Sequence, residues 1–448
     1  MKGLEDRGEQ LARIIKEKII KRETSVAVVG LGYVGLPMAV EQAKAGFFVT
    51  GIDKDISKVE KINNGKSYNP DVPDDVLKNL VENGCLRASH SYNLLHAVDI
   101  IIICVPTPLK MMKQPDLSYV LTVTREIAGH LKPGQLICLE STTFPGTTQE
   151  VVLPILESTG LKAGIDFFLA FSPERVDPGN KNFKPEDISK VVGGVTALCH
   201  EVACVFYNQI IKHVVPVTST EVAEMTKIFE NTYRAVNIAL VNEFMILCDR
   251  MGLDMWEVVD AAATKPFGIQ SFYPGPGVGG HCIPVDPLYL AWKALDYDFR
   301  LRFIDLAEEV NNQATDYVIN KLVRLLNQHK KCLNDSRILV LGVAYKKDID
   351  DIRESPAIKI ISSLQKNHAD VVYHDPYVPK FKMPGKNGIY LENMDLSVEE
   401  INRADCVLIL TDHTCLDYQW VVDNARIILD ARNATKLVQR GKEKITKI

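Results

Sequence analysis

Residues 26–53, VAVVGLGYVGLPMAVEQAKAGFFVTGID, decide the fold of the first half of the chain. They combine a short apolar strand, a glycine-rich turn, a helix and a second strand that ends at an acid. In such a unit Gly30 permits the tight turn, Gly32 lets the backbone approach a pyrophosphate, and Gly35 allows the helix to pack closely. The pattern predicts a βαβ unit whose helix N-terminus faces the phosphates of a dinucleotide.

The acid at the end of the second strand, Asp53, distinguishes the two nicotinamide dinucleotides. A carboxylate there accepts a hydrogen bond from a ribose 2′-hydroxyl and repels a 2′-phosphate, which favours NAD over NADP. Lys54 beside it softens that preference slightly. The alternative is a glycine-rich turn without a ligand, and the strand, helix and acid around the turn argue against it.

Length and composition bound the remaining possibilities. A chain of 448 residues predicts two or three packed units. The 52 basic and 57 acidic side chains give a formal net charge of -5, so no basic field exists to hold a nucleic acid. The 10 cysteines are scattered and no secretory leader precedes them, which predicts reduced thiols in the cytoplasm.

Residues 1–23 predict an amphipathic surface helix, because Leu11, Ile14, Ile15 and Ile19 recur at roughly helical spacing between charges. A membrane-surface role is the alternative, but the acidic residues favour packing on the helix's own domain. No apolar run approaches the length of a membrane helix. We therefore expect no membrane partner.

Short apolar runs continue along the chain and predict two α/β units. The first contains the runs VAVVG, FFVTGID, DIIIICVP, QLICLES, DFFLAFSP and KVVGG, and the second contains RILVLGVAY, DVVYHDP, ADCVLILTD and ARIILDA. Between them, residues 218–251 predict one long helix that opens with a capping box of Thr218 and Glu221. The glycine- and proline-rich residues 273–287 predict an irregular loop, and helical sequence resumes to Gln328.

Cys282 is the cysteine that stands in this glycine-rich loop. The other nine are predicted to be core, as for Cys104, Cys138, Cys204 and Cys406 in apolar runs. With a nicotinamide cofactor, a thiolate can add to a carbonyl, and the hemithioacetal can lose hydride to give a thioester. A buried structural cysteine is the alternative, and His281 is a candidate base although adjacent side chains often point elsewhere.

A metal site is not predicted. Cys199, His200, Cys204 and His213 are potential zinc ligands, but their spacing matches no common zinc pattern.

Lys227 and Asn231 are four residues apart on the long helix and therefore share a face. Such a pair is usually a solvated surface. If the face borders the cysteine loop, both side chains could hold a developing oxyanion, where one donor contributes roughly 3 to 4 kcal/mol. Spacing alone does not choose between these readings.

Seven motifs in order resemble the UDP-glucose/GDP-mannose dehydrogenase family of nucleotide-sugar 6-dehydrogenases. They are GLGYVGLP, VPTP (105–108), ESTTFPGTT (140–148), FSPERVDPGN (171–180), EMTKIFENTYRAVNIALVNE (224–243), GPGVGGHCIPVDP (275–287) and AYKKDIDDIRESPA (344–357). The runs SPERVDPGN and TKPFGIQSFYPGPGVGGHCIPVDP are most similar to the UDP-N-acetylglucosamine branch, which makes a uronic acid for bacterial surface polysaccharides.

The resemblance implies a four-electron oxidation of a sugar C6 alcohol to a carboxylate with two NAD+ in turn. The implied catalytic residues are the nucleophile Cys282, the oxyanion donors Lys227 and Asn231, the water-positioning pair Asp286 and Thr142, and Glu174, which assists thioester hydrolysis. The implied cofactor-binding residues are Gly30, Gly32, Tyr33, Val34, Gly35, Asp53, Thr107, Thr142 and Arg353, the last reaching across a domain cleft. The implied substrate-binding residues are Glu174, Arg175, Lys227, Asn231, Tyr273, Gly279, Lys265 and Lys346, the last contacting the nucleotide.

The implied fold class is α/β, with an N-terminal Rossmann NAD-binding domain, a central long-helix dimerisation segment and a C-terminal Rossmann-like UDP-binding domain. We expect residues 1–23 as the N-terminal helix, 24–215 as the NAD-binding domain, 216–330 as the central segment and 331–448 as the UDP-sugar domain. The expected state is a homodimer or a higher homo-oligomer.

Two departures limit the resemblance to the UDP-glucose enzymes. Pro178 stands where those enzymes have a second Glu, and Lys265-Pro266 stands where a neighbouring subunit supplies an Arg. A Lys cannot reproduce an Arg fork. Both changes agree with an N-acetylated sugar, while UDP-N-acetylmannosamine, UDP-N-acetylgalactosamine and UDP-glucose stay open. A two-electron hydroxyacid-type dehydrogenase and a non-catalytic nucleotide-sugar-binding regulator are the alternatives from other classes.

Overall fold

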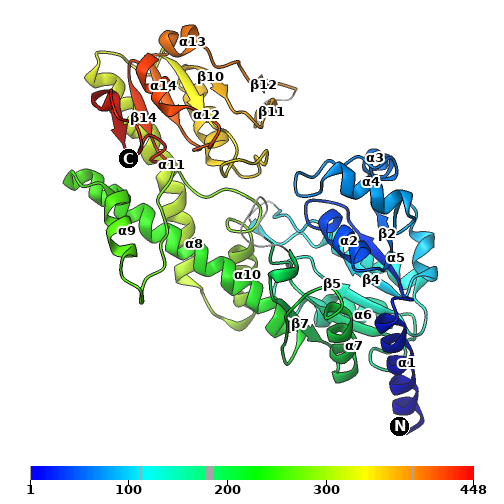
Figure 1. The fold of residues 1–448 in the computed structure, drawn as a ribbon. Coiled ribbons are helices and arrows are strands. Elements are labelled where there is room, and N and C mark those ends of the chain that lie inside the picture. Colours follow the sequence, from blue (N-terminus) through cyan, green and yellow to red (C-terminus); the bar gives the residue numbers. More distant parts are fainter. Residues whose placement is uncertain (1, 111–112, 177–184, 385–387) are drawn as a thin grey trace. The chain divides into compact units, whose positions relative to one another are not determined.

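A computed structural model describes residues 2–110, 113–176, 185–384 and 388–448 (Figure 1). The chain forms two compact units. The N-terminal unit comprises Met1–Glu230 and Leu288–Asp298, and the C-terminal unit comprises Asn231–Pro287 and Phe299–Ile448. Among the described residues, no helix combines the length and the apolar character that crossing a membrane requires.

The N-terminal unit is built on an eight-stranded sheet of order β3-β2-β1-β4-β5-β6-β7-β8. Its strands are β1 Ser25–Val29, β2 Phe48–Ile52, β3 Leu86–Ser89, β4 Ile100–Ile103, β5 Leu136–Leu139, β6 Phe168–Phe171, β7 Lys190–Gly194 and β8 Val214–Pro216. Neighbouring strands from β3 to β6 are parallel, whereas β7 is antiparallel to β6. All six predicted strands are present, and the sheet adds β3 and β8.

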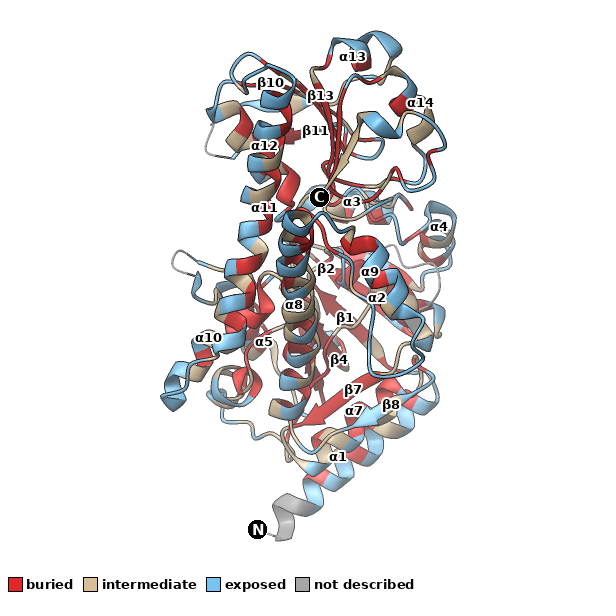
Figure 2. Ribbon diagram, turned by 90° about the vertical axis from the view of Figure 1, so that its left-hand side faces the viewer, coloured by how far each residue is buried: buried red, intermediate tan, exposed pale blue. Residues whose placement is uncertain are grey.

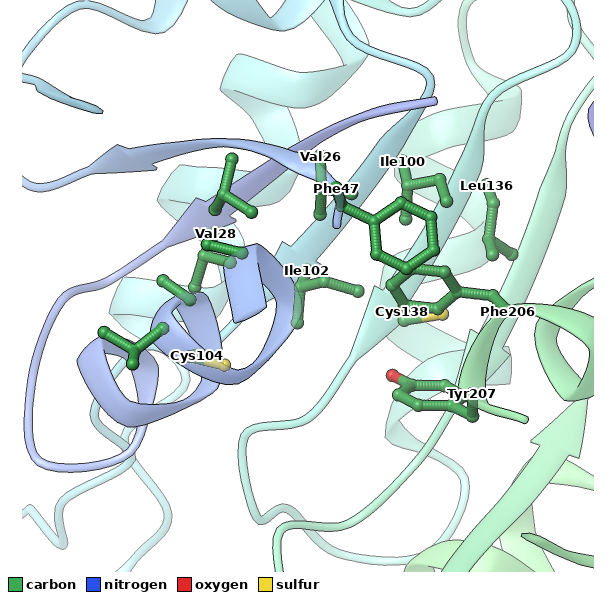
Figure 3. Packing of buried hydrophobic residues seen from close by; sticks show 14 of the residues in the cluster. Val26, Val28, Phe47, Ile100, Ile102, Cys104, Leu136, Cys138, Phe206 and Tyr207 are labelled. Carbon is green, nitrogen blue, oxygen red and sulfur yellow. The ribbon is translucent and has the colours of Figure 1, made fainter. Parts of the chain in front are cut away.

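Helices cover both faces of this sheet. They are α2 Gly35–Lys44, α3 Ile56–Asn63, α4 Asp74–Glu82, α5 Ser118–His130, α6 Leu153–Glu157 and α7 Ala197–Tyr207. On one face Val26, Ile100 and Leu136 from three strands pack against the rings of Phe47 and Phe206 (Figure 3). The central strands β4, β5 and β6 are buried at every residue (Figure 2), which explains why their sequences are continuous apolar runs.

The N-terminal helix α1, Lys2–Ile20, packs on its own unit against α7. Ala12, Ile15 and Ile19 are buried in this contact, and Lys16 forms an ion pair of 2.6 Å with Glu201. The predicted packing is therefore confirmed.

The long helix α8 spans Thr220–Met251, 32 residues, as the uninterrupted sequence predicts. The predicted capping box at Thr218 is wrong by one residue. The Ser219 hydroxyl accepts a hydrogen bond from the Val222 N–H at 3.3 Å, and the helix begins one residue later.

The C-terminal unit is built on a five-stranded sheet of order β10-β9-β13-β14-β15, with all neighbours parallel. Its strands are β9 Arg337–Leu341, β10 Asp370–His374, β13 Cys406–Ile409, β14 Ile428–Asp430 and β15 Ile445–Lys447, and β11 Lys380–Lys382 and β12 Tyr390–Glu392 form a separate pair. Its helices are α9 Met255–Ala263, α11 Arg302–Gln328, α12 Pro356–Lys366, α13 Val398–Arg403 and α14 Tyr418–Asn424. The four predicted strands are present, and α11 ends at the predicted Gln328. The predicted irregular loop gives way to α10, Asp286–Ala294.

Candidate functional site: a glycine turn and a cysteine loop

The turn after β1 has the geometry that a pyrophosphate needs. Gly30 has φ +96°, a conformation that favours glycine. A Cβ on Gly35 would lie 1.8 Å from the Gly30 carbonyl oxygen, so α2 can begin here only with glycine. A Cβ on Gly32 would meet no atom within 4 Å, so its backbone faces open space. The N-cap residue Val34 makes no side-chain capping bond, which leaves the helix terminus suited to an anion.

Asp53 closes this turn from the end of β2. Its Oδ2 accepts a hydrogen bond from the Leu31 N–H at 2.8 Å, and its Oδ1 accepts one from the Asp55 N–H at 2.9 Å. Lys58 Nζ also lies 3.5 Å from Oδ2. A carboxylate has about four acceptor positions, so the described residues leave one position of Asp53 for a ribose hydroxyl. Lys54 is turned toward Tyr119, with its Nζ 4.9 Å from the ring centroid. The residues present therefore fit a dinucleotide.

Three further predicted residues follow parallel strands of the same sheet. Thr107 comes after β4, Thr142 after β5 and Glu174 after β6. Because the carboxyl ends of parallel strands meet at one edge of a sheet, these residues lie at the edge that also carries Gly30. The topology brings the predicted cofactor and hydrolysis residues of this unit to one side.

Glu174 is held as a carboxylate within this unit. Its Oε1 accepts hydrogen bonds from the N–H groups of Arg175 and Val176, both at 2.7 Å, and its Oε2 accepts one from Lys190 at 3.1 Å. Burial acts to raise the pKa of Glu174, but the Lys190 charge and the Val176 N–H outweigh it and the pKa is lowered. Glu174 is therefore ionised at neutral pH.

Sequence reasoning missed the residues that surround Glu174. The Lys190 side chain, on β7, is 5% exposed and also contacts Glu140 Oε2 at 2.7 Å. The Tyr207 hydroxyl donates to the other oxygen of Glu140. The available signal was a lysine and a glutamate at the ends of two otherwise apolar runs, KVVGG and QLICLES, because a charge in a buried strand requires a partner.

The face of α8 that carries Lys227 and Asn231 is not a solvated surface. Lys227 is 7% exposed and Asn231 is fully buried. One residue before Asn231, Glu230 pairs with Arg175 at 2.6 Å. The solvated reading of the Lys/Asn pair is therefore wrong, and Arg175, a predicted substrate residue, is directed to α8.

In the C-terminal unit, Asn231 belongs to a hydrogen-bonded chain. Arg234 donates to Asn231 Oδ1, and Asn231 Nδ2 donates to Asp286 Oδ2 at 2.5 Å. A guanidinium can only donate, so it fixes which end of the Asn231 amide faces Asp286. Asp286 is buried at the first position of α10, and its N–H donates to the Cys282 carbonyl at 2.8 Å.

The cysteine loop rests on residues 345–356, which follow β9. The Gly280 N–H donates to the Arg353 carbonyl at 2.8 Å, and Gly280 has φ +83°. A Cβ on Gly279 would lie 2.6 Å from the Tyr345 Cβ, so this glycine serves close packing. Cys282 itself is half-buried. Of the other nine, all predicted to be core, five are buried, Cys85 and Cys204 are half-buried, and the prediction is wrong for Cys332 and Cys415, which are exposed.

The candidate base His281 lies among charged groups of the same loop region. Burial lowers its pKa most, the Arg353 charge lowers it further, and the carboxylates of Asp351 and Glu354 oppose the shift. His281 is therefore neutral at pH 7. No group of three or more His, Cys, Asp or Glu could hold a metal ion anywhere in the described ranges.

The remaining predicted substrate and cofactor residues have these surroundings. Arg353 pairs with Asp351 at 2.6 Å. Lys346 is half-buried beside Tyr345. The Tyr273 ring stacks on Trp256 of α9 with 5.4 Å between centroids, and its hydroxyl donates to Asp260 at 2.6 Å.

Lys265 and Pro178 are the two positions that depart from the UDP-glucose enzymes. Lys265 is exposed, with its Nζ 4.9 Å from the Phe267 ring centroid. Pro178 lies outside the described residues.

Proteins named as nucleotide-sugar dehydrogenases match most of the chain. A UDP-N-acetyl-D-mannosamine dehydrogenase of Pyrococcus horikoshii is 35% identical over 418 residues, which are 92% of this chain and 96% of that protein. A UDP-N-acetyl-D-glucosamine 6-dehydrogenase of Pseudomonas aeruginosa is 37% identical over 363 residues, which are 80% of this chain and 84% of that protein. The solved structure of the Pyrococcus horikoshii UDP-D-ManNAc dehydrogenase matches with a TM-score of 0.83 at 34% identity, covering 92% of this chain and 96% of that one.

Three family models match in order. They describe the NAD binding domain over residues 24–211, the central domain over residues 221–313 and the UDP binding domain over residues 339–437. The glycine turn falls in the first, the cysteine loop in the second and the β9 turn in the third. The chain therefore belongs to the UDP-glucose/GDP-mannose dehydrogenase family of NAD-dependent nucleotide-sugar oxidoreductases.

Proposed function

We propose that the protein oxidises the C6 alcohol of UDP-N-acetylglucosamine to the uronic acid in two NAD-dependent steps, through a thioester on Cys282. The observation that carries this proposal is the link between the cysteine loop and α8. Asn231 donates to Asp286, and the Asp286 N–H donates to the Cys282 carbonyl, so the Asn231 amide, the Asp286 carboxylate and the backbone of Cys282 belong to one hydrogen-bonded group.

The dinucleotide would be held by the turn at Gly30, Gly32, Tyr33, Val34 and Gly35, by Asp53, and by Thr107, Thr142 and Arg353. Bound NAD+ supplies the hydride acceptor for each oxidation. Asp53 binds the ribose, and the N-terminus of α2 binds the pyrophosphate. Lys346 would bind the diphosphate of the sugar nucleotide, and Arg175, Tyr273, Gly279 and Lys265 would contact the substrate.

The chain's own residues then carry the carbonyl chemistry. The Cys282 thiolate adds to the C6 aldehyde carbon, and the oxyanion that forms accepts hydrogen bonds from Lys227 and Asn231. Loss of hydride from that adduct leaves the thioester. Water then attacks the carbonyl carbon, Glu174 accepts a proton from the water, and the C–S bond breaks to release the thiolate. Asp286 and Thr142 position the water.

The choice of sugar rests on likeness. Relatives of 33 to 37% identity are named for both N-acetyl-D-mannosamine and N-acetyl-D-glucosamine substrates, and one is named for an N-acetyl-D-galactosaminuronic acid. We propose the glucosamine substrate because the runs around Glu174 and Cys282 are most similar to that branch. The test is the kcat/KM for four substrates side by side: UDP-N-acetylglucosamine, UDP-N-acetylmannosamine, UDP-N-acetylgalactosamine and UDP-glucose. A clear preference for UDP-glucose would reject an N-acetylated substrate.

The role of Cys282 has its own test. Cys282→Ala is expected to abolish acid formation, and Cys282→Ser is expected to block the second oxidation. A two-electron dehydrogenase, the competing activity, would tolerate both changes. Normal uronate formation by the Ala variant contradicts the thioester route.

We also propose that a second copy of the chain covers the exposed face of α8. Tyr233, Leu240, Phe244, Leu247 and Met251 recur on this face and are all exposed. Beside this stripe, Val236 and Ala239 pack against Ala307 and Val310 of α11. An exposed apolar stripe of this length is typical of an interface.

Leu247→Glu is expected to convert a dimer to a monomer in light scattering, and a wild-type monomer would contradict the proposal.

A further inference from the structure

The Glu174 carboxylate is one member of a buried charge cluster. We define the cluster as Lys190, Glu140, Glu174 and Tyr207. Lys190 Nζ lies 2.7 Å from Glu140 Oε2 and 3.1 Å from Glu174 Oε2, and it also lies 5.4 Å from the Tyr207 ring centroid. The side chains of Lys190, Glu140 and Glu174 are 5%, 0% and 14% exposed.

Lys190 forms ion pairs with both Glu140 and Glu174. Burial lowers the pKa of Lys190, but Glu140 and Glu174 outweigh this effect and the pKa is raised, so the ammonium is permanent at neutral pH. Burial raises the pKa of Glu140 despite the lysine. Among the described residues, Lys227 of α8 and Cys104 after β4 also interact electrostatically with Glu174. A buried carboxylate deprived of its cation is expected to take up a proton.

The hydrogen bonds of Glu174 occupy three of the four acceptor positions of its carboxylate. The two backbone donors, from Arg175 and Val176, occupy Glu174 Oε1. Lys190 occupies one of the two acceptor positions on Oε2. Among the described residues nothing else donates to Oε2, so the remaining position is the one from which a water molecule could be oriented and deprotonated.

We propose that Lys190 is a positioning residue for thioester hydrolysis: it fixes Glu174 as a carboxylate with one open acceptor position on Oε2. This inference rests on the proposed function, in which Glu174 accepts the water proton. In that step a C–O bond forms, the C–S bond breaks, the electron pair leaves on the Cys282 sulfur, and one water proton moves to Glu174. The resulting acid then loses its own proton to solvent.

The test compares Lys190→Met/Glu140→Gln with Glu140→Gln alone. The double variant removes one positive and one negative charge together, so it avoids an unpaired buried Glu140. For the double variant, we expect the acid limb of the pH profile of kcat to shift to higher pH by about one unit or more. At the acid end of the profile this shift lowers kcat by about tenfold. The acyl-enzyme should accumulate and be visible by mass spectrometry, while the KM for the sugar nucleotide changes little. In Glu140→Gln alone, Lys190 still pairs with Glu174, so the acid limb of the pH profile of this variant should not move to higher pH.

A double variant that folds and hydrolyses the thioester at the wild-type rate, with the wild-type acid limb, overturns the proposal. If the double variant does not fold, Lys190→Arg provides the measurement. Arginine keeps the positive charge but replaces the compact ammonium with a planar guanidinium. The acid limb of the pH profile should therefore stay in place while thioester hydrolysis slows. An unchanged hydrolysis rate overturns the positioning role. Failure of the proposed function looks different: the wild-type protein would then form no acyl-enzyme, or Glu174→Gln would hydrolyse it normally.

Discussion

The turns that follow β1 and β9 are built in the same way and used differently. Each has a left-handed glycine after the first strand, Gly30 with φ +96° and Gly342 with φ +83°. Each has an acid at the end of the next strand that accepts hydrogen bonds from the turn. Asp53 accepts from Leu31, and Asp375 accepts from Val343 and Ala344 at 2.7 and 3.0 Å.

The difference lies in what else the two acids contact. Asp375 is fully buried, and its Oδ2 also lies 3.0 Å from His413 Nε2. His413 Nδ1 accepts from the Asp348 N–H at 3.0 Å, so the ring proton is on Nε2 and is donated to Asp375. The Asp53 side chain, by contrast, is 11% exposed. The same fold position thus carries, in one unit, the acid for which we propose a ribose contact and, in the other, an acid that is bonded inside the protein as an internal anchor. We therefore expect the second turn to bind a nucleotide through other residues.

The largest effect is expected from breaking the internal anchor. Asp375→Asn weakens two backbone hydrogen bonds and the His413 contact inside the protein, which should cost about 3 kcal/mol or more of unfolding free energy. Denaturant unfolding of the C-terminal unit measures this cost. Asp53→Asn is the matched control at the equivalent position and should cost less than about 1 kcal/mol. Equal losses would contradict the distinction between the two acids.

The same acid predicts a pH dependence. Burial acts to raise the pKa of Asp375, but His413 and the turn N–H groups outweigh it and the pKa is lowered. A lowered folded-state pKa contributes stability above the unfolded value of about 3.9, and this contribution is lost as the pH falls through the folded-state value. Unfolding measured from pH 6 downward should show a smaller acid-dependent loss in Asp375→Asn than in the wild type. Parallel curves would exclude this role.

A smaller effect, on cofactor choice, is expected at Asp53. Asp53→Asn removes the charge that repels a 2′-phosphate, so the preference for NAD over NADP should fall by about tenfold. The ratio of kcat/KM for the two cofactors measures it. Asp375→Asn should leave this ratio unchanged, and a change there would mean that both acids sense the cofactor.

A comparable change in binding is expected for Lys346, beside the second turn. Lys346→Ala should raise the KM for the sugar nucleotide by about tenfold and leave the KM for NAD unaltered. Lys347→Ala, the exposed neighbour, is the control. Equal effects of the two alanine variants would remove Lys346 from the nucleotide site.

The smallest effect is expected from Lys58, whose Nζ lies 3.5 Å from Asp53 Oδ2. Its side chain is 33% exposed, so the pair is screened and Lys58→Ala should change the unfolding free energy by less than about 0.5 kcal/mol. A loss as large as that of Asp375→Asn would show that Asp53 also acts as an anchor.

The sequence predicts the central strands better than the edges. Ile100–Ile103 is a pure apolar run because β4 is buried on both faces, whereas LRAS of β3 and ITK of β15 alternate with polar residues and carry no such signal. The glycines around Cys282 identify the loop, because only close packing or positive φ requires them. Lys190 could not be assigned, since its partner Glu140 is 50 residues away and only the folded sheet brings the two together.

The most direct test of the four-electron assignment is the number of NADH molecules released per UDP-N-acetylglucosamine consumed, with the product identified by mass spectrometry. The account predicts two NADH and a uronic acid for the wild-type protein. One NADH with an aldehyde or ketone product would contradict it.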